Sequence, residues 1–144
     1  MKNTINLLTL FLVFTSTMGQ YGKVMDHLTL DSKILKGERN FAVYLPPDYD
    51  HSSRSYPVLY LLHGAGGDYT TWTSNVPSLQ KYANEYNILI VCPDGGSISW
   101  YFDSPIDDQI KYETYISKEL VDVIDNKYKT IPENTKQYTN IPKT

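Results

Sequence analysis

The sequence has 144 residues, of which 41% are hydrophobic, so it can form one modest core and has room for a single domain. The net charge is −3 and the lysines are scattered, which excludes the concentrated basic surface typical of nucleic-acid-binding proteins. Cys92 is the only cysteine and ends an apolar run, so we expect a buried structural thiol and no disulfide within these residues.

The N-terminus has the pattern of a secretory signal peptide. Lys2 precedes an apolar segment over residues 5–14, and small residues follow it up to Gly19. This segment is shorter than the about 20 apolar residues that a membrane-spanning helix requires. We therefore expect a signal peptide at residues 1–19, one domain over residues 20–144, and a secreted or periplasmic location. The alternative is an N-terminal helix of the fold.

Two segments that follow have the composition of β-strands. Residues 24–30 and 38–45 are predicted to pair antiparallel, with a turn at Lys36-Gly37. Pro46-Pro47 ends the second strand, because proline cannot donate a hydrogen bond to a neighbouring strand. Side chains of the second strand alternate between two faces. Phe41, Val43 and Leu45 share one face, and Ala42 and Tyr44 share the other.

The most informative stretch is an apolar run that ends in a glycine-rich loop. Residues 58–62 predict a parallel strand covered on both faces, because apolar and polar side chains do not alternate. Ligand sites in open α/β sheets lie at the carboxyl ends of the strands. Gly64, Gly66 and Gly67 permit positive φ angles and close approach. Backbone amides around Ala65 could therefore point at a developing negative charge.

A helix and a strand are predicted next. Residues 72–86 place apolar side chains at helical spacing, with a cap near Ser74 or Asn75 and Pro77 in the first turn. Residues 88–92 are continuously apolar and predict a second buried strand. Strand, helix and strand together predict one parallel β-α-β unit.

The segment after this unit combines an aromatic loop with the clearest helix of the sequence. Trp100 and Tyr101 lie in a loop over residues 97–109 and could line an acyl or sugar subsite; the alternative is that they only pack the loop down. Residues 110–127 carry an apolar stripe at helical spacing. Glu113 lies in the first turn, where the helix dipole favours a carboxylate, so we expect a structural role for it.

Several spaced motifs, in one order, resemble the esterase branch of the α/β-hydrolase superfamily, which includes S-formylglutathione hydrolases, feruloyl and acetyl esterases and the antigen 85 proteins. The similarity covers about residues 38–137. It rests on Tyr60-Leu61-Leu62-His63-Gly64-Ala65-Gly66-Gly67, Trp72, Ile90-Val91-Cys92-Pro93-Asp94-Gly95-Gly96 and Tyr112-Glu113-Thr114-Tyr115. The resemblance implies a carboxylic-ester hydrolase in which the amide of Ala65 belongs to the oxyanion hole. It also implies that His63, Gly64, Gly66 and Gly67 support that loop.

The same resemblance implies a nucleophilic serine on a G-x-S-x-G elbow, followed by an acid and a histidine. No such elbow occurs in the 144 residues, although the family places one shortly after the position of Lys136-Gln137-Tyr138. Members of this family are roughly twice this length. We therefore expect the N-terminal portion of an α/β-hydrolase fold, truncated before the nucleophile-elbow strand and inactive alone. A nucleophilic role for Ser97, Ser99 or Ser104 is disfavoured because no histidine is placed to activate them.

A second class of function stays open at this stage. A non-catalytic secreted module could bind carbohydrate through exposed aromatic side chains such as Trp72, Trp100 and Tyr101, the residues that would otherwise contact the ester substrate. A dinucleotide site is disfavoured, because the third glycine of G-x-G-x-x-G would fall at Tyr69. We expect no metal and no cofactor, no stable membrane insertion after signal removal, and self-association through an exposed strand edge.

Overall fold

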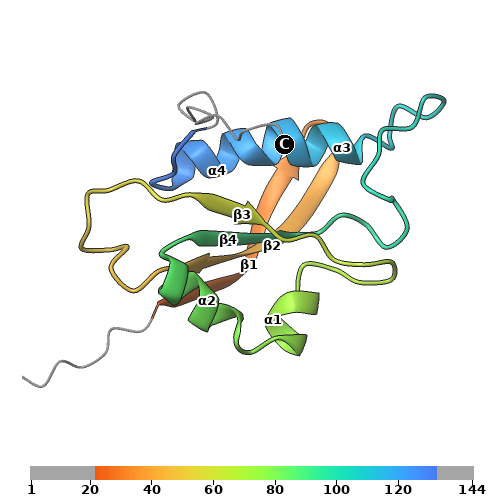
Figure 1. The fold of residues 1–144 in the computed structure, drawn as a ribbon. Helices are drawn as coiled ribbons and strands as arrows, with labels where there is room; N and C mark the ends of the chain where they lie inside the picture. The colour runs from red at the N-terminus through yellow and green to blue at the C-terminus, as the bar shows by residue number, and fades with distance from the viewer. Residues whose placement is uncertain (1–21, 133–144) are drawn as a thin grey trace, which may run out of the picture.

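The computed structural model describes residues 22–132, and the predicted signal peptide lies outside this range. These residues form a four-stranded sheet with the order β1-β2-β4-β3 (Figure 1). The strands are β1 (Lys23–Ser32), β2 (Gly37–Leu45), β3 (Val58–Tyr60) and β4 (Leu89–Pro93). β1 pairs antiparallel with β2, β2 pairs antiparallel with β4, and β3 runs parallel to β4. The predicted antiparallel pair that leads into a parallel β-α-β unit is confirmed.

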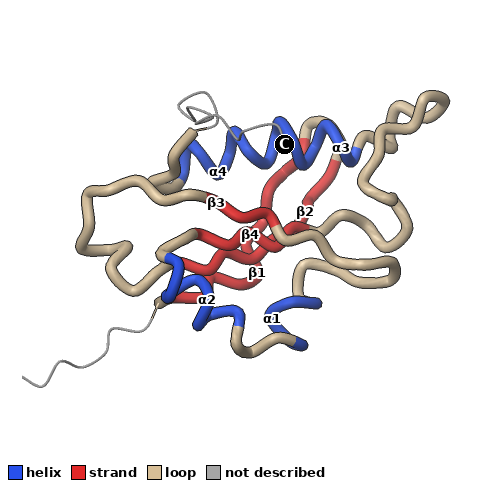
Figure 2. The backbone as a smooth tube through the Cα atoms, in the orientation of Figure 1, coloured by secondary structure: helices blue, strands red, loops and turns tan. Residues whose placement is uncertain are grey.

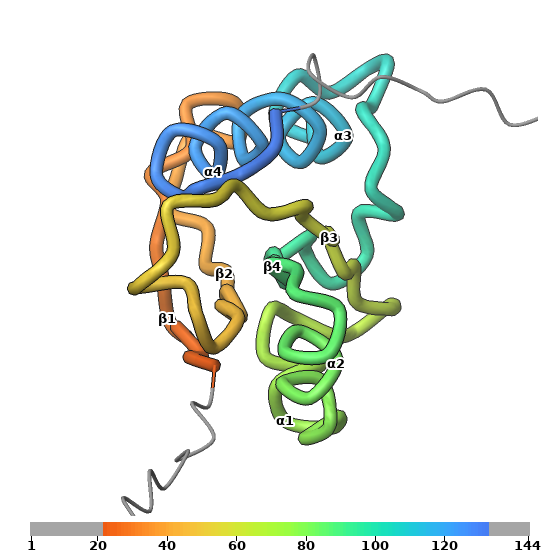
Figure 3. The backbone as a smooth tube through the Cα atoms, turned by 60° about the vertical axis from the view of Figure 1, so that its left-hand side comes forward, coloured from red at the N-terminus to blue at the C-terminus, as the bar shows by residue number. Residues whose placement is uncertain are grey.

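The alternation in β2 divides the core into two layers, as predicted. Phe41, Val43 and Leu45 pack into a cluster beneath the long C-terminal helix. Ala42 and Tyr44 point to the opposite face of the sheet, where they pack with residues of the helical segment between β3 and β4. Helices therefore cover both faces of the sheet, as Figures 2 and 3 show.

The predicted helix over residues 72–86 is wrong in its continuity. Two short helices occur instead, α1 (Thr71–Asn75) and α2 (Leu79–Tyr86). Val76 leaves the helical region with φ −128° and ψ 73°, because the ring of Pro77 restricts the residue that precedes it. Ser78, rather than Ser74 or Asn75, directly precedes the second helix.

The C-terminal helix is confirmed with a later start. It consists of α3 (Tyr112–Thr114), the π-helical segment η1 (Tyr115–Leu120) and α4 (Val121–Lys127). Tyr115, Leu120 and Ile124 are completely buried and form the predicted stripe against the sheet. None of the helices described between residues 22 and 132 has the length and apolar character needed to cross a membrane.

The two apolar strands of the β-α-β unit have different surroundings. Every residue of β4 is buried, and the Cys92 thiol has its pKa raised to about 12 by desolvation, as expected of a structural cysteine. β3 contains only three residues and lies at the edge of the described sheet. Leu59 is 45% exposed and Leu62 is 38% exposed, so the prediction that this strand is covered on both faces is wrong for the described residues.

Candidate active site

The loop after β3 is organised by the buried ring of His63. Its Nδ1 lies 2.8 Å from the carbonyl oxygen of Gly64, and its Nε2 lies 3.0 Å from the amide nitrogen of Gly95. A carbonyl can only accept and an amide N–H can only donate, so these contacts assign a neutral imidazole with its proton on Nδ1. His63 thereby joins the loops that follow β3 and β4, rather than pointing a free nitrogen at solvent.

The peptide unit between Gly64 and Ala65 is fixed from its carbonyl side. Gly64 oxygen accepts from His63 Nδ1 and also from the amide of Gly67, at 3.1 Å. The C=O and N–H of a trans peptide lie in one plane and point in opposite directions. Fixing the carbonyl therefore fixes the direction of the Ala65 N–H, which donates to no residue between 22 and 132. A rigid and available backbone donor results.

The loop after β4 approaches the glycine loop directly. The amide of Gly66 donates to the carbonyl of Ser97 at 2.7 Å. Gly66 and Gly96 have φ angles of +76° and +72°, which side chains with a Cβ rarely adopt. Asp94 Oδ1 accepts from the amide of Gly96 at 2.9 Å and closes the turn that leaves β4.

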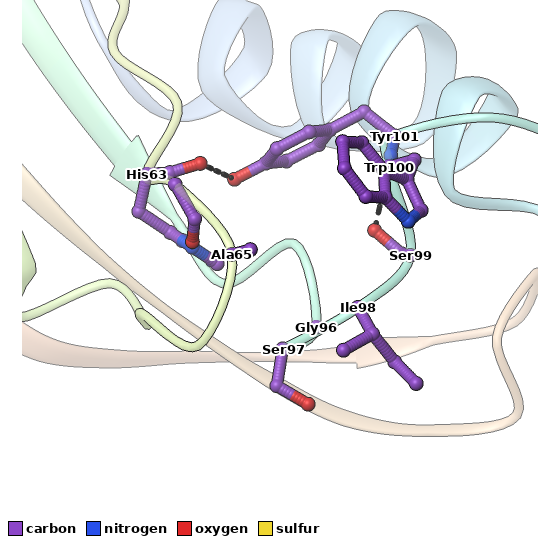
Figure 4. Close-up of a pocket in the computed structure, with 9 residues that line it drawn as sticks. His63, Ala65, Gly96, Ser97, Ile98, Ser99, Trp100 and Tyr101 are labelled. Carbon is purple, nitrogen blue, oxygen red and sulfur yellow. Dashed lines mark hydrogen bonds between the residues drawn. The ribbon is translucent and has the colours of Figure 1, made fainter.

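A cavity of about 200 Å³ lies between these two loops (Figure 4). The glycine loop supplies one wall and the aromatic loop supplies the other. The lining residues are His63, Gly64, Ala65, Gly96, Ser97, Ile98, Ser99, Trp100 and Tyr101. Trp100 is 80% exposed, whereas the Tyr101 hydroxyl reaches inward and donates to the carbonyl of His63 at 3.0 Å.

Of the predicted substrate residues, the structure brings Trp100 and Tyr101 to the cavity but not Trp72. The Trp72 side chain packs on the Ala42 and Tyr44 layer of the core, and its indole N–H donates to the carbonyl of Leu62 at 3.1 Å. Trp72 therefore contacts the segment that follows β3 from the Ala42 and Tyr44 side of the sheet. Trp72 is not among the residues that line this cavity, and its indole N–H is already engaged by the Leu62 carbonyl.

Two internal serines have hydroxyls committed to loop structure. Ser99 is buried, and its hydroxyl donates to the carbonyl of Gly95 while it accepts from the amide of Tyr101. Ser104 is buried as well, and its hydroxyl accepts from the amide of Asp107 at 3.0 Å. Neither hydroxyl has a histidine partner in the described part of the chain. Their geometry is that of turn-stabilising groups rather than activated nucleophiles.

Two carboxylates hold the ends of the candidate site. Hydrogen bonds from the Thr70 hydroxyl and amide lower the pKa of Asp68 at the end of the glycine loop. Hydrogen bonds from the Thr114 hydroxyl and amide lower the pKa of Asp103 in the aromatic loop. Asp103 therefore caps the start of the C-terminal helix from a distant position in sequence, a role that sequence reasoning missed.

Metal chemistry has no ligand set in the described region. Between residues 22 and 132, no three His, Cys, Asp or Glu side chains lie together in a way that could hold a metal ion. The chemical resources of the cavity are backbone amides, aromatic surface and hydroxyl groups. That combination suits stabilisation of an oxyanion more than coordination of a cation.

Comparison with known proteins gives the class of protein. The fold of the described residues is the N-terminal portion of the α/β-hydrolase fold. The sequence model of the family described as "Putative esterase" matches residues 32–138. The chain therefore belongs to this esterase family.

Individual relatives agree with that assignment. Esterase MT1326 of Mycobacterium tuberculosis is 36% identical over 94 residues, which is 63% of this chain and 20% of that protein. A ferulic acid esterase structure is 32% identical with a TM-score of 0.64, covering 76% of this chain and 46% of that one. The serine hydrolase FphF of Staphylococcus aureus is 26% identical with a TM-score of 0.67, covering 77% and 43%. The chain thus spans a fifth of that curated relative and under half of these structures.

Proposed function

We propose that these residues form the oxyanion-hole half of an exported serine esterase that hydrolyses acyl, acetyl or feruloyl esters. The observation that supports this most directly is the Ala65 amide, which is held at the cavity wall and donates to no described residue. A second amide, a nucleophilic serine, an acid and a histidine would come from sequence beyond these 144 residues. The similarity to a ferulic acid esterase and to a serine hydrolase supports the same chemistry.

The chemical step sets the requirement that Ala65 would meet. Attack of a serine on an ester carbonyl places negative charge on the carbonyl oxygen, and preorganised amides stabilise that charge. A donor is effective when it does not reorient during the reaction. The Gly64–Ala65 peptide satisfies this condition, because two hydrogen bonds fix its carbonyl.

Substrate contact is proposed for the opposite wall of the cavity. Trp100, which is 80% exposed, and Tyr101 line the same cavity as Ala65. An acyl or aromatic group could pack on this wall while its carbonyl faces the amide.

Export is proposed from residues 1–19, and determination of the mature N-terminus by mass spectrometry tests it.

The esterase proposal is tested with the chain alone and in a hybrid. We expect the 144-residue chain to hydrolyse p-nitrophenyl acetate no faster than buffer, because it lacks a G-x-S-x-G nucleophile. A hybrid in which residues 22–132 of this chain replace the matching segment of FphF should hydrolyse p-nitrophenyl acetate. Organophosphate-sensitive turnover by the chain alone would contradict the proposal that the nucleophilic serine lies outside these 144 residues. A folded but inactive hybrid would contradict the assignment of the site.

The exposure of Trp100 also supports the second candidate, a carbohydrate-binding module. This alternative predicts saturable binding of soluble polysaccharide by the isolated chain, with loss of binding in Trp100→Ala. The esterase proposal predicts no such binding by the chain alone. Affinity electrophoresis in gels that contain xylan distinguishes the two functions.

A further inference from the structure

Tyr101 makes three separate contacts at the cavity, two with His63 of the opposite wall and one with Gly95 of its own loop. Its hydroxyl donates to the His63 carbonyl at 3.0 Å, and its ring meets the His63 ring edge to face, with centroids 5.6 Å apart. The same ring lies directly over Gly95, where a Cβ atom would overlap the Tyr101 carbons. Gly95 in turn donates its amide to His63 Nε2. Tyr101, Gly95 and His63 therefore form one closed unit, the Tyr101 clasp.

The backbone conformation of the aromatic loop is unusual where the clasp begins. Trp100 and Tyr101 have φ angles of +56° and +55°, a region that residues with large side chains rarely occupy. Two consecutive residues in this region cost free energy, so other contacts must compensate. The Ser99 hydroxyl accepts from the Tyr101 amide at 3.1 Å, and the Tyr101 hydroxyl makes the bond to His63. Figure 4 shows the Tyr101 phenol reaching toward the His63 carbonyl, whereas Trp100, the residue before it, is 80% exposed.

The contact to His63 acts on the peptide unit next to the free amide. Tyr101 fixes the carbonyl of His63, and the His63 ring fixes the carbonyl of Gly64. Consecutive peptide planes are thus held from outside the glycine loop, and the second one carries the Ala65 N–H. Burial raises the pKa of Tyr101, which keeps its hydroxyl protonated and able to donate.

We propose that Tyr101 is a positioning residue that fixes the orientation of the Ala65 amide through the His63 carbonyl, with Gly95 providing the space for its ring. The inference rests on the proposed function only in giving the Ala65 amide a chemical role. That Tyr101 fixes the orientation of this amide follows from the contacts alone. It assigns to the aromatic loop a task separate from contact with substrate.

The test is hydrogen exchange, followed by mass spectrometry with electron-transfer fragmentation, on the 144-residue chain. The Tyr101→Phe variant keeps the ring over Gly95 and removes only the hydroxyl. Loss of one hydrogen bond corresponds to about fivefold in an opening equilibrium, so the amides of Gly66 and Gly67 should exchange about fivefold faster. The amide of Leu61, which bonds to Val91, should be unchanged. Tyr86→Phe is the matched control, because Tyr86 is 63% exposed on α2.

Global stability separates positioning from a general structural role. The urea midpoint of Tyr101→Phe should fall by no more than corresponds to this fivefold change in the unfolding equilibrium, because only one hydrogen bond is lost. Unchanged exchange at Gly66 and Gly67 would overturn the proposal, as would an equal acceleration at Leu61. Gly95→Ala supplies a second test, since its methyl group displaces the Tyr101 ring and should accelerate the same amides.

The hybrid with FphF keeps the two proposals distinguishable. If both hold, Tyr101→Phe lowers kcat about fivefold with little change in KM, because the displaced amide acts in the transition state. Faster exchange with an unchanged kcat in an active hybrid would support the Tyr101 clasp and contradict the role of the Ala65 amide in the oxyanion hole. Unchanged exchange would reject the clasp, whatever the activity of the hybrid.

Discussion

β3 and β4 run parallel and side by side, and each delivers a glycine-containing loop to the same end of the sheet. β4 has a neighbour on both sides and is buried throughout. β3 has one described neighbour, and its central residue Leu59 is 45% exposed. Both strands are apolar runs in the sequence. Composition therefore reports that a strand is suited to burial, whereas its position in the sheet decides how much burial it obtains.

The loops differ in a complementary way. The glycine loop after β3 is short, is closed by its own hydrogen bonds, and leaves the Ala65 amide without an acceptor among the described residues. The loop after β4 carries large aromatic side chains and two consecutive positive φ angles. The edge strand thus presents the proposed chemical group, and the buried strand anchors the loop that holds it. A strand fixed on both sides can support a strained loop better than an edge strand can.

The largest expected effect tests the difference between the strands. Leu89→Ala should lower the free energy of unfolding by about 3 kcal/mol or abolish the cooperative transition, because Leu89 is completely buried. Leu59→Ala should cost less than about 1 kcal/mol, because much of its surface already contacts water. Urea unfolding monitored by circular dichroism measures both. Equal losses would show that β3 is covered as fully as β4.

The next effect concerns the proposed donor on the edge-strand loop. Ala65→Pro removes the amide hydrogen, and the hybrid with FphF should lose about a hundredfold in kcat, since one oxyanion donor contributes on the order of 3 kcal/mol. Ala65→Ser keeps the amide and serves as the control. A folded proline variant with full kcat would assign the oxyanion donor to another group.

A smaller effect tests the open side of β3. An edge strand presents unpaired backbone groups, and no charged side chain or proline interrupts Val58–Tyr60. We expect the chain to form oligomers, and Leu59→Lys should shift the population toward monomer. Tyr86→Lys changes an exposed residue on α2 and should leave the distribution unchanged. Analytical ultracentrifugation decides, and a parent chain that is already a monodisperse monomer would contradict the prediction.

The sequence predicted the elements better than the contacts between them. The alternation in residues 38–45 and the stripe in residues 110–127 are local periodic patterns, and both were confirmed. The break at Pro77 was missed, although the proline is visible, because helical spacing extends across it. The hydrogen bond from Tyr101 to His63 joins residues 38 positions apart, so no local pattern contains it.

The candidate site shows the same division. The glycines after β3 predicted a loop with available amides, and two of them show why glycine is needed there: Gly66 takes a positive φ, and Gly67 is closely approached by the Thr71 side chain. The sequence did not indicate why a glycine is needed at position 95. Its φ angle is not positive, and glycine is required there because the Tyr101 ring occupies the space of a Cβ atom. Asp103 likewise caps a helix that begins nine positions later, beyond the reach of capping motifs.

The smallest expected effect compares the carboxylates that hold the two loops. Hydrogen bonds from threonine lower the pKa of both Asp68 and Asp103. A carboxyl whose pKa is lower in the folded state stabilises the fold above its ordinary pKa, near pH 4, and loses that contribution as the pH falls further. Asp103→Asn should therefore be slightly less stable than the parent at pH 7. The difference should shrink toward zero as the pH falls below about 4.

Hydrogen exchange locates this effect in one loop. At pH 7, Asp103→Asn should accelerate exchange at the amide of Thr114, which donates to Asp103 at 3.0 Å, while the amide of Thr70 keeps its bond to Asp68. Asp68→Asn should show the reverse pattern. Asp50→Asn is the control, because Asp50 is exposed and makes no hydrogen bond within residues 22–132. A stability difference that stayed constant from pH 7 to pH 3 would show that shape, rather than charge, holds the aromatic loop.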